Sequence, residues 1–293
     1  MSSTSPTVFV TAAGGQLGRR TVTALLERIA PDRVIAGLRN LDSEAAAQFR
    51  ARGVAVRLAD YDRPDTLAAA FEGIDRLLLI SSNEIGQRVQ QHGNAIEAAR
   101  GAGIGMLAYT SVLRADRSSL APAEEHRQTE RILRESGLPH VLLRNGWYSE
   151  NYTASIPSAL THQALIGSAG TGRIAAAARA DYAEAAAVVL TDAGQGTAEI
   201  YELAGDEAFT LADFAAEIAR ASGRPIAYRD LPEAAYRDIL LGAGLPAPLA
   251  ALIAGSDAAA AEGALFDDGH ALSRLIGRPT TPFAASIEKA LAG

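Results

Sequence analysis

The chain has 293 residues, with 34 acidic residues against 27 Lys and Arg, a net charge of -7 and no cysteine. The missing cysteine excludes disulfides, thiolate-ligated zinc, iron–sulfur clusters and cysteine nucleophiles. The acidic balance argues against nucleic acid as the main ligand, because affinity for it comes mainly from cations that meet phosphates. The N-terminal MSSTSP resembles no signal peptide, and no long uncharged apolar run follows it, so we expect a cytoplasmic protein without membrane insertion.

Short apolar runs alternate with longer amphipathic segments through the first half of the chain. Between the first two runs, residues 16–29 place Val22, Leu25, Leu26 and Ile29 on one helical face. Strand followed by helix, repeated, is the βαβ pattern, whose crossovers cover both faces of a parallel sheet. The sequence therefore predicts an α/β fold with a doubly wound, Rossmann-like parallel sheet. The predicted strands are 7–11, 34–38, 54–58, 76–80, 106–110 and 140–143.

The pattern changes after about residue 150. Residues 155–172 are punctuated by Ser, Pro and Gly, residues 180–192 resemble a helix, 199–203 resemble a strand, and the Ala-rich 257–264 favours a packed helix over a linker. We therefore expect a Rossmann domain over 1–150, with 180–204 returning to it. A smaller, mostly helical substrate lobe would comprise 151–179 and 205–293.

The first predicted strand runs directly into a glycine-rich turn, and a helix opens there. Glycines let the backbone approach a pyrophosphate, while the helix N-terminus offers N–H groups to the anion. Dinucleotide binding is the favoured interpretation, and an ordinary turn between strand and helix is the alternative. The cofactor candidates in this turn are Ala12, Ala13, Gly14, Gly15, Gln16, Leu17 and Gly18.

Arg39 follows the second predicted strand, at the place where an NAD-binding unit carries an acidic residue for the ribose 2'-hydroxyl. Its guanidinium is a planar fork of donors that suits a 2'-phosphate. We therefore expect NADPH to be preferred and NADH to bind more weakly, with a solvated surface arginine as the alternative.

Polar residues follow three further strands at the same edge of the sheet, where open α/β folds bind their ligands. Each is equally well explained as turn chemistry, and only their shared location makes them cofactor candidates. They are Asp60, Tyr61, Ser81, Ser82, Asn83 and Ser111.

Two later segments carry candidates for the reaction itself. His126, near the start of a predicted helix, would be a proton donor or a ribose contact if it faces the cleft, or else an exposed helix histidine. Trp147, Tyr148 and Tyr152 stand close together after the sixth strand and would either wall a pocket for a flat ligand or anchor the second lobe.

Several stretches together resemble the NmrA-like atypical short-chain dehydrogenase/reductases, and among them the bacterial type-2 NAD(P)H:quinone oxidoreductases. The resemblance covers nearly the whole chain; LLRNGWYSENY is specific, whereas GQLG is generic. The stretches are GQLG at 15–18, LADY at 58–61, LLLISS at 77–82, AYTS at 108–111, LLRNGWYSENY at 142–152, RADYA at 179–183, YELAGD at 201–206, LFDD at 265–268, and LIG and PTT around Gly277 and Pro279.

The resemblance implies a two-electron reduction of a small-molecule quinone by NADPH, in a cleft between two lobes, without flavin or metal. It implies that Arg39 holds the 2'-phosphate and that residues 81–83 flank the nicotinamide half. Tyr148 would join His126 as a catalytic candidate, and Trp147 and Tyr152 would contact the substrate. A homodimer is left open. The later segment implied to flank the nicotinamide comprises Asn145, Gly146, Trp147, Tyr148, Ser149 and Glu150.

The chain departs from the family pattern at two places. Where the glycine turn usually reads Gly-Ala-Thr-Gly, this chain begins with Ala12, whose Cβ would oppose a positive φ. The Tyr-x-x-x-Lys pair of the wider superfamily is replaced by Pro122 and His126. A missing tyrosine donor favours a quinone over a ketone, because the delocalised phenolate that forms can take its proton from water afterwards. A redox sensor without turnover and a reductase of dyes or other conjugated electrophiles are the alternatives.

Overall fold

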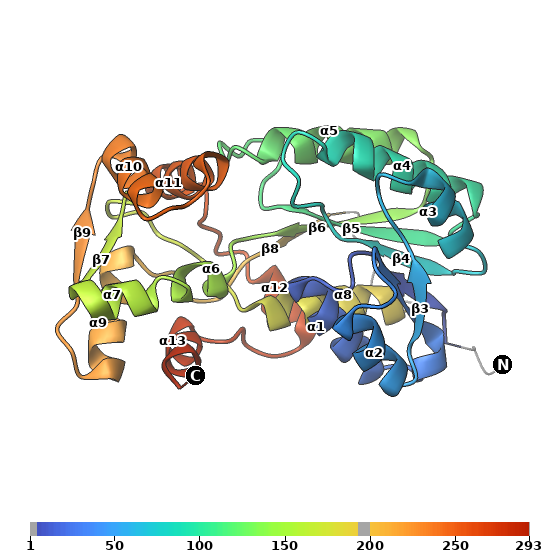
Figure 1. Cartoon of the computed structure of the whole chain (residues 1–293), viewed down its shortest axis with the longest axis horizontal. Helices are drawn as coiled ribbons and strands as arrows, with labels where there is room; N and C mark the ends of the chain where they lie inside the picture. Colours follow the sequence, from blue (N-terminus) through green and yellow to red (C-terminus); the bar gives the residue numbers. More distant parts are fainter. Residues whose placement is uncertain (1–4, 193–199, 293) are drawn as a thin grey trace. The chain divides into compact units, whose positions relative to one another are not determined.

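The computed structural model describes residues 5–192 and 200–292 (Figure 1). They form two compact units. Unit 1 comprises residues up to 115, 124–145 and 179–201, and unit 2 comprises 116–123, 146–178 and 202–293. The chain first enters unit 2 at 116–123, which the sequence did not suggest. The crossing that corresponds to the expected boundary at 150 lies after residue 145, five residues earlier.

A seven-stranded sheet in the order β3-β2-β1-β4-β5-β6-β8 is the centre of unit 1. Adjacent strands from β3 to β6 are parallel, as predicted. The order reverses between β1 and β4, which in open α/β sheets marks the crevice where ligands bind. The strands are β1 (Val8–Val10), β2 (Val34–Leu38), β3 (Ala55–Leu58), β4 (Arg76–Leu79), β5 (Met106–Val112), β6 (His140–Asn145) and β8 (Ile200–Leu203).

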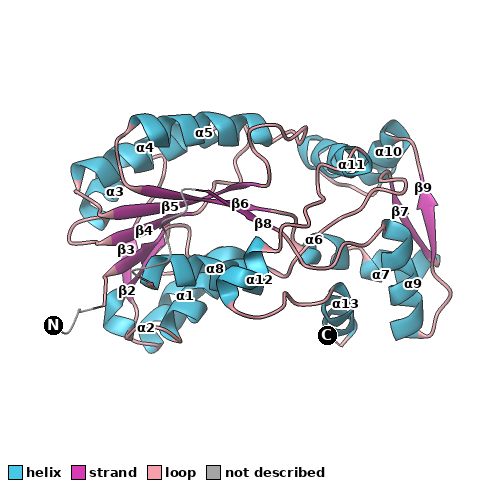
Figure 2. Ribbon diagram, turned by 180° about the vertical axis from the view of Figure 1, so that it is seen from behind, coloured by secondary structure: helices cyan, strands magenta, loops and turns pink. Residues whose placement is uncertain are grey.

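Helices cover both faces of this sheet. One face carries α1 (Gln16–Leu26), α2 (Glu44–Ala51) and α8 (Arg179–Thr191), and the other carries α3 (Pro64–Ala70), α4 (Arg88–Gly101) and α5 (Ala123–Glu135) (Figure 2). A 3-10 turn, η1 (Pro31–Arg33), leads into β2. The central strands are buried apart from Arg76 at the start of β4 and Met106 and His140 at the starts of β5 and β6, and Phe9 of β1 meets Phe71 edge to face at 5.1 Å between ring centroids. Burial on both faces explains why the strands are continuously apolar.

Unit 2 is mostly helical, as expected, but it also contains a two-stranded parallel sheet of β7 (Ala164–Gly167) and β9 (Ala227–Asp230) that the sequence did not predict. Its aromatic core includes Phe209, Phe214 and Phe283. The helices are α6 (Ser149–Thr153), α7 (Ile156–His162), α9 (Leu211–Ser222), α10 (Glu233–Gly242), α11 (Ala247–Ala261), α12 (Ala271–Ile276) and α13 (Phe283–Leu291).

Most predicted elements appear with small shifts at their ends. The first helix stops at Leu26, three residues short, and β6 extends two residues further than predicted. The strand predicted at 199–203 is β8, although its first residue lies outside the described part of the chain. Among residues 5–192 and 200–292, no helix combines the length and the apolar character that crossing a membrane requires.

Candidate active site

The glycine turn closes tightly between β1 and α1. Gly15 N–H donates to the Ala12 carbonyl at 3.0 Å, and a Cβ built on Gly18 would lie 2.6 Å from that same oxygen and 2.6 Å from Ala13 Cα. Only glycine therefore lets α1 approach the turn this closely. No side chain caps α1 at Gly15 and its first turn holds no acidic residue, so the first N–H groups of the helix are available to an anion. This cradle fits a pyrophosphate.

Ala12 adopts the left-handed conformation, with φ 46°. The family pattern has glycine here, and the structure shows why: the turn requires a positive φ that costs an L-residue roughly 1–2 kcal/mol. The side chain is exposed, so the methyl group itself is not buried among neighbouring side chains. The substitution therefore keeps the turn geometry and introduces backbone strain.

We expect Ala12→Gly to raise the free energy of unfolding by about 0.5–1 kcal/mol, since relief of the left-handed strain exceeds the entropy cost of glycine. Cofactor affinity should stay the same or increase, because a methyl group leaves the turn. Ala13→Gly is the control: Ala13 is buried with an ordinary φ, so this variant should be less stable. Chemical denaturation of both variants decides the matter, and a destabilised Ala12→Gly would contradict the account.

The carboxyl ends of the central strands are tied together by short hydrogen bonds. Thr11 Oγ1 donates to the Leu78 carbonyl at 2.9 Å and accepts from Ile80 N–H at 2.9 Å. The Tyr61 hydroxyl lies 2.6 Å from Thr11 Oγ1 and 2.7 Å from the Ile80 carbonyl, and Ser81 N–H donates to Thr110 Oγ1 at 2.8 Å. Burial raises the pKa of Tyr61, so its phenol stays protonated and serves this local network.

Asp60 and Asn83 occupy loop positions at the same edge. One Asp60 carboxylate oxygen accepts from Asp62 N–H at 3.1 Å, and Asp60 N–H donates to Thr66 Oγ1 at 3.0 Å, so the residue organises its own turn. Asn83 is exposed. Both remain cofactor candidates by location, together with the half-buried Ser81.

Arg39 lies just past β2 with an exposed side chain. Its Nη1 is 2.9 Å from Glu84 Oε1. The guanidinium therefore has an anionic partner within the chain, and both interpretations of Arg39, a 2'-phosphate ligand and a solvated surface arginine, remain predictions.

His126 is buried, with 5% of its surface exposed, so the alternative of an exposed helix histidine is wrong. Its Nδ1 lies 2.7 Å from the Tyr109 hydroxyl. Burial, followed by the charges of Arg88 and His92, lowers the pKa of His126 to about 3. At neutral pH the imidazole is uncharged, which disfavours an imidazolium acid and leaves hydrogen bonding as its available role.

Sequence reasoning missed a buried network behind His126. His92 Nε2 lies 2.9 Å from Ser82 N–H, which can only donate, so the neutral ring carries its proton on Nδ1. That Nδ1 lies 3.0 Å from Thr129 Oγ1 and 3.4 Å from the Tyr109 hydroxyl. The network joins the Ser82 loop to α5. No sequence signal identifies it, because a polar residue on a helix shows its burial only in the tertiary structure.

Ser111 also has a structural partner. Its hydroxyl donates to Glu130 Oε1 at 2.6 Å. The Glu130 carboxylate also accepts from Arg144 Nε at 2.9 Å and from Arg144 Nη2 at 2.7 Å. Glu130 is 1% exposed and Arg144 is 5% exposed. This buried ion pair links α5 to the end of β6, and it uses the one proton that the Ser111 hydroxyl could have donated to a cofactor.

The specific segment passes from unit 1 into unit 2 after Asn145, the last residue of β6. Within unit 2, Ser149 N–H donates to the Ala177 carbonyl at 2.9 Å. Tyr152 is buried against Phe209, at 5.8 Å between ring centroids, and belongs to the aromatic core of unit 2. This position supports the alternative that it anchors the second lobe. Trp147, Tyr148 and Glu150 are half-buried, whereas Gly146 is buried.

Three buried oxygens in this segment have no hydrogen-bond partner among the described residues: Asn145 Oδ1, Ser149 Oγ and Tyr152 Oη. Buried polar atoms are rarely left unpaired, and such atoms mark places where water or a ligand completes the structure. Asn145 Oδ1 is an acceptor at the carboxyl end of β6, the edge where unit 1 is expected to bind its ligand.

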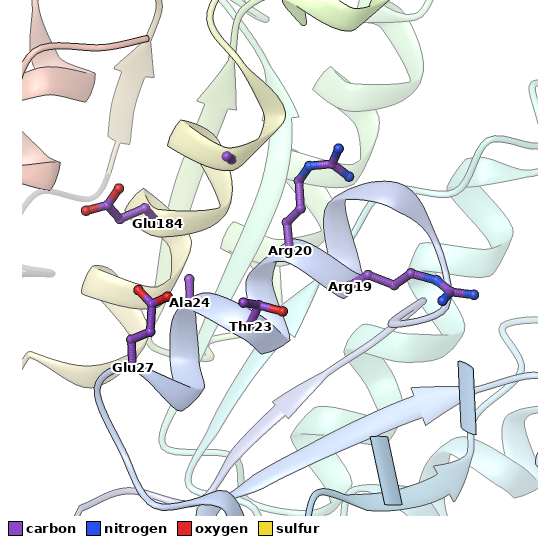
Figure 3. A pocket seen from close by; sticks show the side chains of 7 residues that line it. Arg19, Arg20, Thr23, Ala24, Glu27 and Glu184 are labelled. Carbon is purple, nitrogen blue, oxygen red and sulfur yellow. The ribbon is translucent and has the colours of Figure 1, made fainter. Parts of the chain in front are cut away.

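A surface pocket of about 300 Å³ lies elsewhere on unit 1, between α1 and α8 (Figure 3). None of the predicted cofactor residues lines it, so it has no part in the candidate site. In the described part of the chain, no cluster of three or more His, Asp or Glu is placed to hold a metal ion. The pocket is lined by Arg19, Arg20, Thr23, Ala24, Glu27, Ala180 and Glu184.

Comparison with known proteins gives relatives that extend over the whole chain. The model of the family described as NmrA-like matches residues 4–289. Quinone oxidoreductase 2 of Escherichia coli (strain K12) is 48% identical over 96% of this chain and 97% of its own. A crystal structure of the E. coli NADPH-dependent quinone oxidoreductase complexed with NADPH superposes with a TM-score of 0.93 at 48% identity, covering 97% of this chain and 99% of that one. Citrobacter sp. triphenylmethane reductase complexed with NADP(H) gives 0.92 at 31% identity, covering 97% and 99%.

Proposed function

We propose that this chain, which belongs to the NmrA-like family, is a flavin-free oxidoreductase that transfers hydride from NADPH to a quinone. The observation that carries the proposal is the 48% identity, over nearly the full length of both chains, to a protein named quinone oxidoreductase 2. The geometry agrees, since an uncapped helix N-terminus behind a tight glycine turn lies at the switch point of the sheet, with Arg39 at the end of the next strand.

When bound, NADPH would supply the hydride. The chain's own residues bind and orient: the turn from Ala12 to Gly18 takes the pyrophosphate and Arg39 takes the 2'-phosphate. Asn145 Oδ1, the unpaired acceptor at the end of β6, is suited to an amide N–H. Trp147 and Tyr148 are the candidates for aromatic contact with a flat acceptor.

A dedicated proton donor is not required for this reaction. Hydride addition to a quinone gives a delocalised phenolate that water can protonate afterwards, whereas a ketone needs its proton as the alkoxide forms. His126 is neutral and buried at neutral pH, and the position of the superfamily's tyrosine is Pro122. The binding residues therefore act mainly by holding NADPH, the hydride donor, in contact with the quinone that accepts the hydride.

Arg39→Ala tests the cofactor assignment. We expect the Kd for NADPH to rise by about tenfold to a hundredfold, the equivalent of a charge-assisted hydrogen-bond pair, and the Kd for NADH to change little. Nicotinamide fluorescence measures both. Arg100→Ala, which removes an exposed charge on α4, is the matched control. An equal loss for both nucleotides would remove Arg39 from the 2'-phosphate site.

A second acceptor class is supported by the likeness to triphenylmethane reductase at 31% identity and a TM-score of 0.92. Both a quinone and a triphenylmethane dye are conjugated electrophiles that accept hydride and delocalise the resulting electrons. Initial rates with benzoquinones and with triphenylmethane dyes, at saturating NADPH, would rank the two classes. Binding of NADPH without oxidation by any acceptor would favour a redox sensor.

A further inference from the structure

The guanidinium proposed to hold the 2'-phosphate is paired with a carboxylate of the chain itself. Arg39 Nη1 lies 2.9 Å from Glu84 Oε1. Arg39 follows β2 and Glu84 lies in the loop after β4, so the contact joins the ends of two strands on either side of β1. The two side chains are 65% and 40% exposed. A cofactor phosphate must therefore compete with an accessible carboxylate for the same donor.

Glu84 is held in this position from its other side. Its Oε2 accepts from Gln91 Nε2 at 3.0 Å, and the same amide nitrogen lies 3.0 Å from Asp62 Oδ1. Gln91 is 2% exposed, so the amide is fixed by burial and directs both carboxylates. The carboxylate that contacts Arg39 therefore has a second, buried partner, and its negative charge lowers the attraction of the Arg39 guanidinium for a further anion.

The loop that carries Glu84 does not depend on the Arg39 contact. Gly86 N–H donates to Glu125 Oε1 at 2.8 Å, Arg88 Nε donates to the Ser82 carbonyl at 2.6 Å, and Ser82 N–H donates to His92. These bonds hold the backbone on both sides of Glu84. The carboxylate can therefore leave Arg39 by side-chain rotation while the loop keeps its place.

We propose that Glu84 is an internal competitor for the 2'-phosphate and sets the degree to which the protein prefers NADPH over NADH. The inference rests on the proposed NADPH-dependent function. An exposed ion pair is weak, whereas phosphate carries more charge and suits the guanidinium fork, so NADPH displaces Glu84 at a cost. NADH lacks the phosphate and leaves the pair intact. A carboxylate is also the group that accepts a ribose 2'-hydroxyl in NAD-binding sites. Glu84 therefore lowers the preference for NADPH over NADH in two ways: it weakens NADPH binding, and it suits the 2'-hydroxyl of NADH.

The test compares wild type with Glu84→Gln and Glu84→Ala by titration with NADPH, NADH and adenosine 2',5'-bisphosphate. We expect the Kd values for NADPH and the bisphosphate to fall by roughly threefold to tenfold, about the strength of an exposed ion pair plus the removed repulsion. The Kd for NADH should not fall. In an Arg39→Ala background, the same substitutions should lower the Kd for NADPH by clearly less than in wild type, because the contested donor is gone and only the removed repulsion remains.

Glu97→Gln is the matched control, since it removes one charge from an exposed ion pair with Arg100 on α4. It should leave every Kd unchanged. Tightening of NADH equal to that of NADPH, the same tightening in Glu97→Gln, or a full effect without Arg39 would each overturn the proposal. If wild type binds NADPH and both Glu84 variants bind it with the same Kd, this inference alone is overturned. If wild type binds neither nucleotide, the proposed function is overturned.

Discussion

Gly18→Ala is expected to destabilise unit 1 and to weaken NADPH binding by about tenfold to a hundredfold, the equivalent of one lost hydrogen bond to the charged pyrophosphate. The new Cβ would lie 2.6 Å from both the Ala12 carbonyl oxygen and Ala13 Cα. Both are backbone atoms, so no side chain can rotate away, and α1 must move off the turn. Such overpacking costs about 1–3 kcal/mol of the free energy of unfolding. Thermal unfolding and fluorescence titration measure the two effects.

Gly93→Ala is the control for this variant. Gly93 lies within α4, where a Cβ would meet no heavy atom within 4 Å, and its φ is not positive. Alanine there should stabilise the helix by about 0.5–1 kcal/mol and leave NADPH binding unchanged. If Gly18→Ala bound NADPH as tightly as wild type, the glycine turn would not be the pyrophosphate site.

Glu130→Gln is the second variant with a large expected effect. It keeps the shape of the side chain but removes the carboxylate that two nitrogens of the buried Arg144 contact at 2.9 and 2.7 Å. Removal of one partner from a buried ion pair costs about 3–5 kcal/mol. We expect the free energy of unfolding to fall by that amount, measured by chemical denaturation at neutral pH.

Glu124→Gln provides the comparison on the same helix. Glu124 pairs with Arg127 at 2.7 Å, but the two side chains are 59% and 36% exposed, and such pairs contribute about 0–1 kcal/mol. Equal losses in the free energy of unfolding would show that the buried Glu130–Arg144 pair stabilises the protein no more than the exposed Glu124–Arg127 pair does.

The sheet of unit 1 could be predicted from the sequence because its central strands are buried on both faces and stand out as apolar runs. The sheet of unit 2 could not. β9 is exposed at three of its four positions, so it lacks the apolar signature, and β7 follows directly after the short helix α7. Local propensity was overridden there by pairing between segments far apart in the chain.

The candidate site also contains residues that the sequence could predict and residues that it could not. The glycine turn and Arg39 follow from their positions after strands, since parallel strands bring their carboxyl ends to one edge. Glu84 could not be predicted as the partner of Arg39, because the contact depends on how a loop folds back across β1. His126 shows the same limit: flanking charges suggested exposure, yet a hydrogen bond to Tyr109 satisfies the buried ring.

The central claim, NADPH-dependent reduction of a quinone, is tested most directly in one cuvette. The purified protein is titrated with NADPH, followed by nicotinamide fluorescence, and 1,4-benzoquinone is then added. We predict saturable NADPH binding that is tighter than NADH binding, followed by steady oxidation of NADPH over many turnovers without added flavin. Saturable binding with no oxidation by the quinone would contradict the claim.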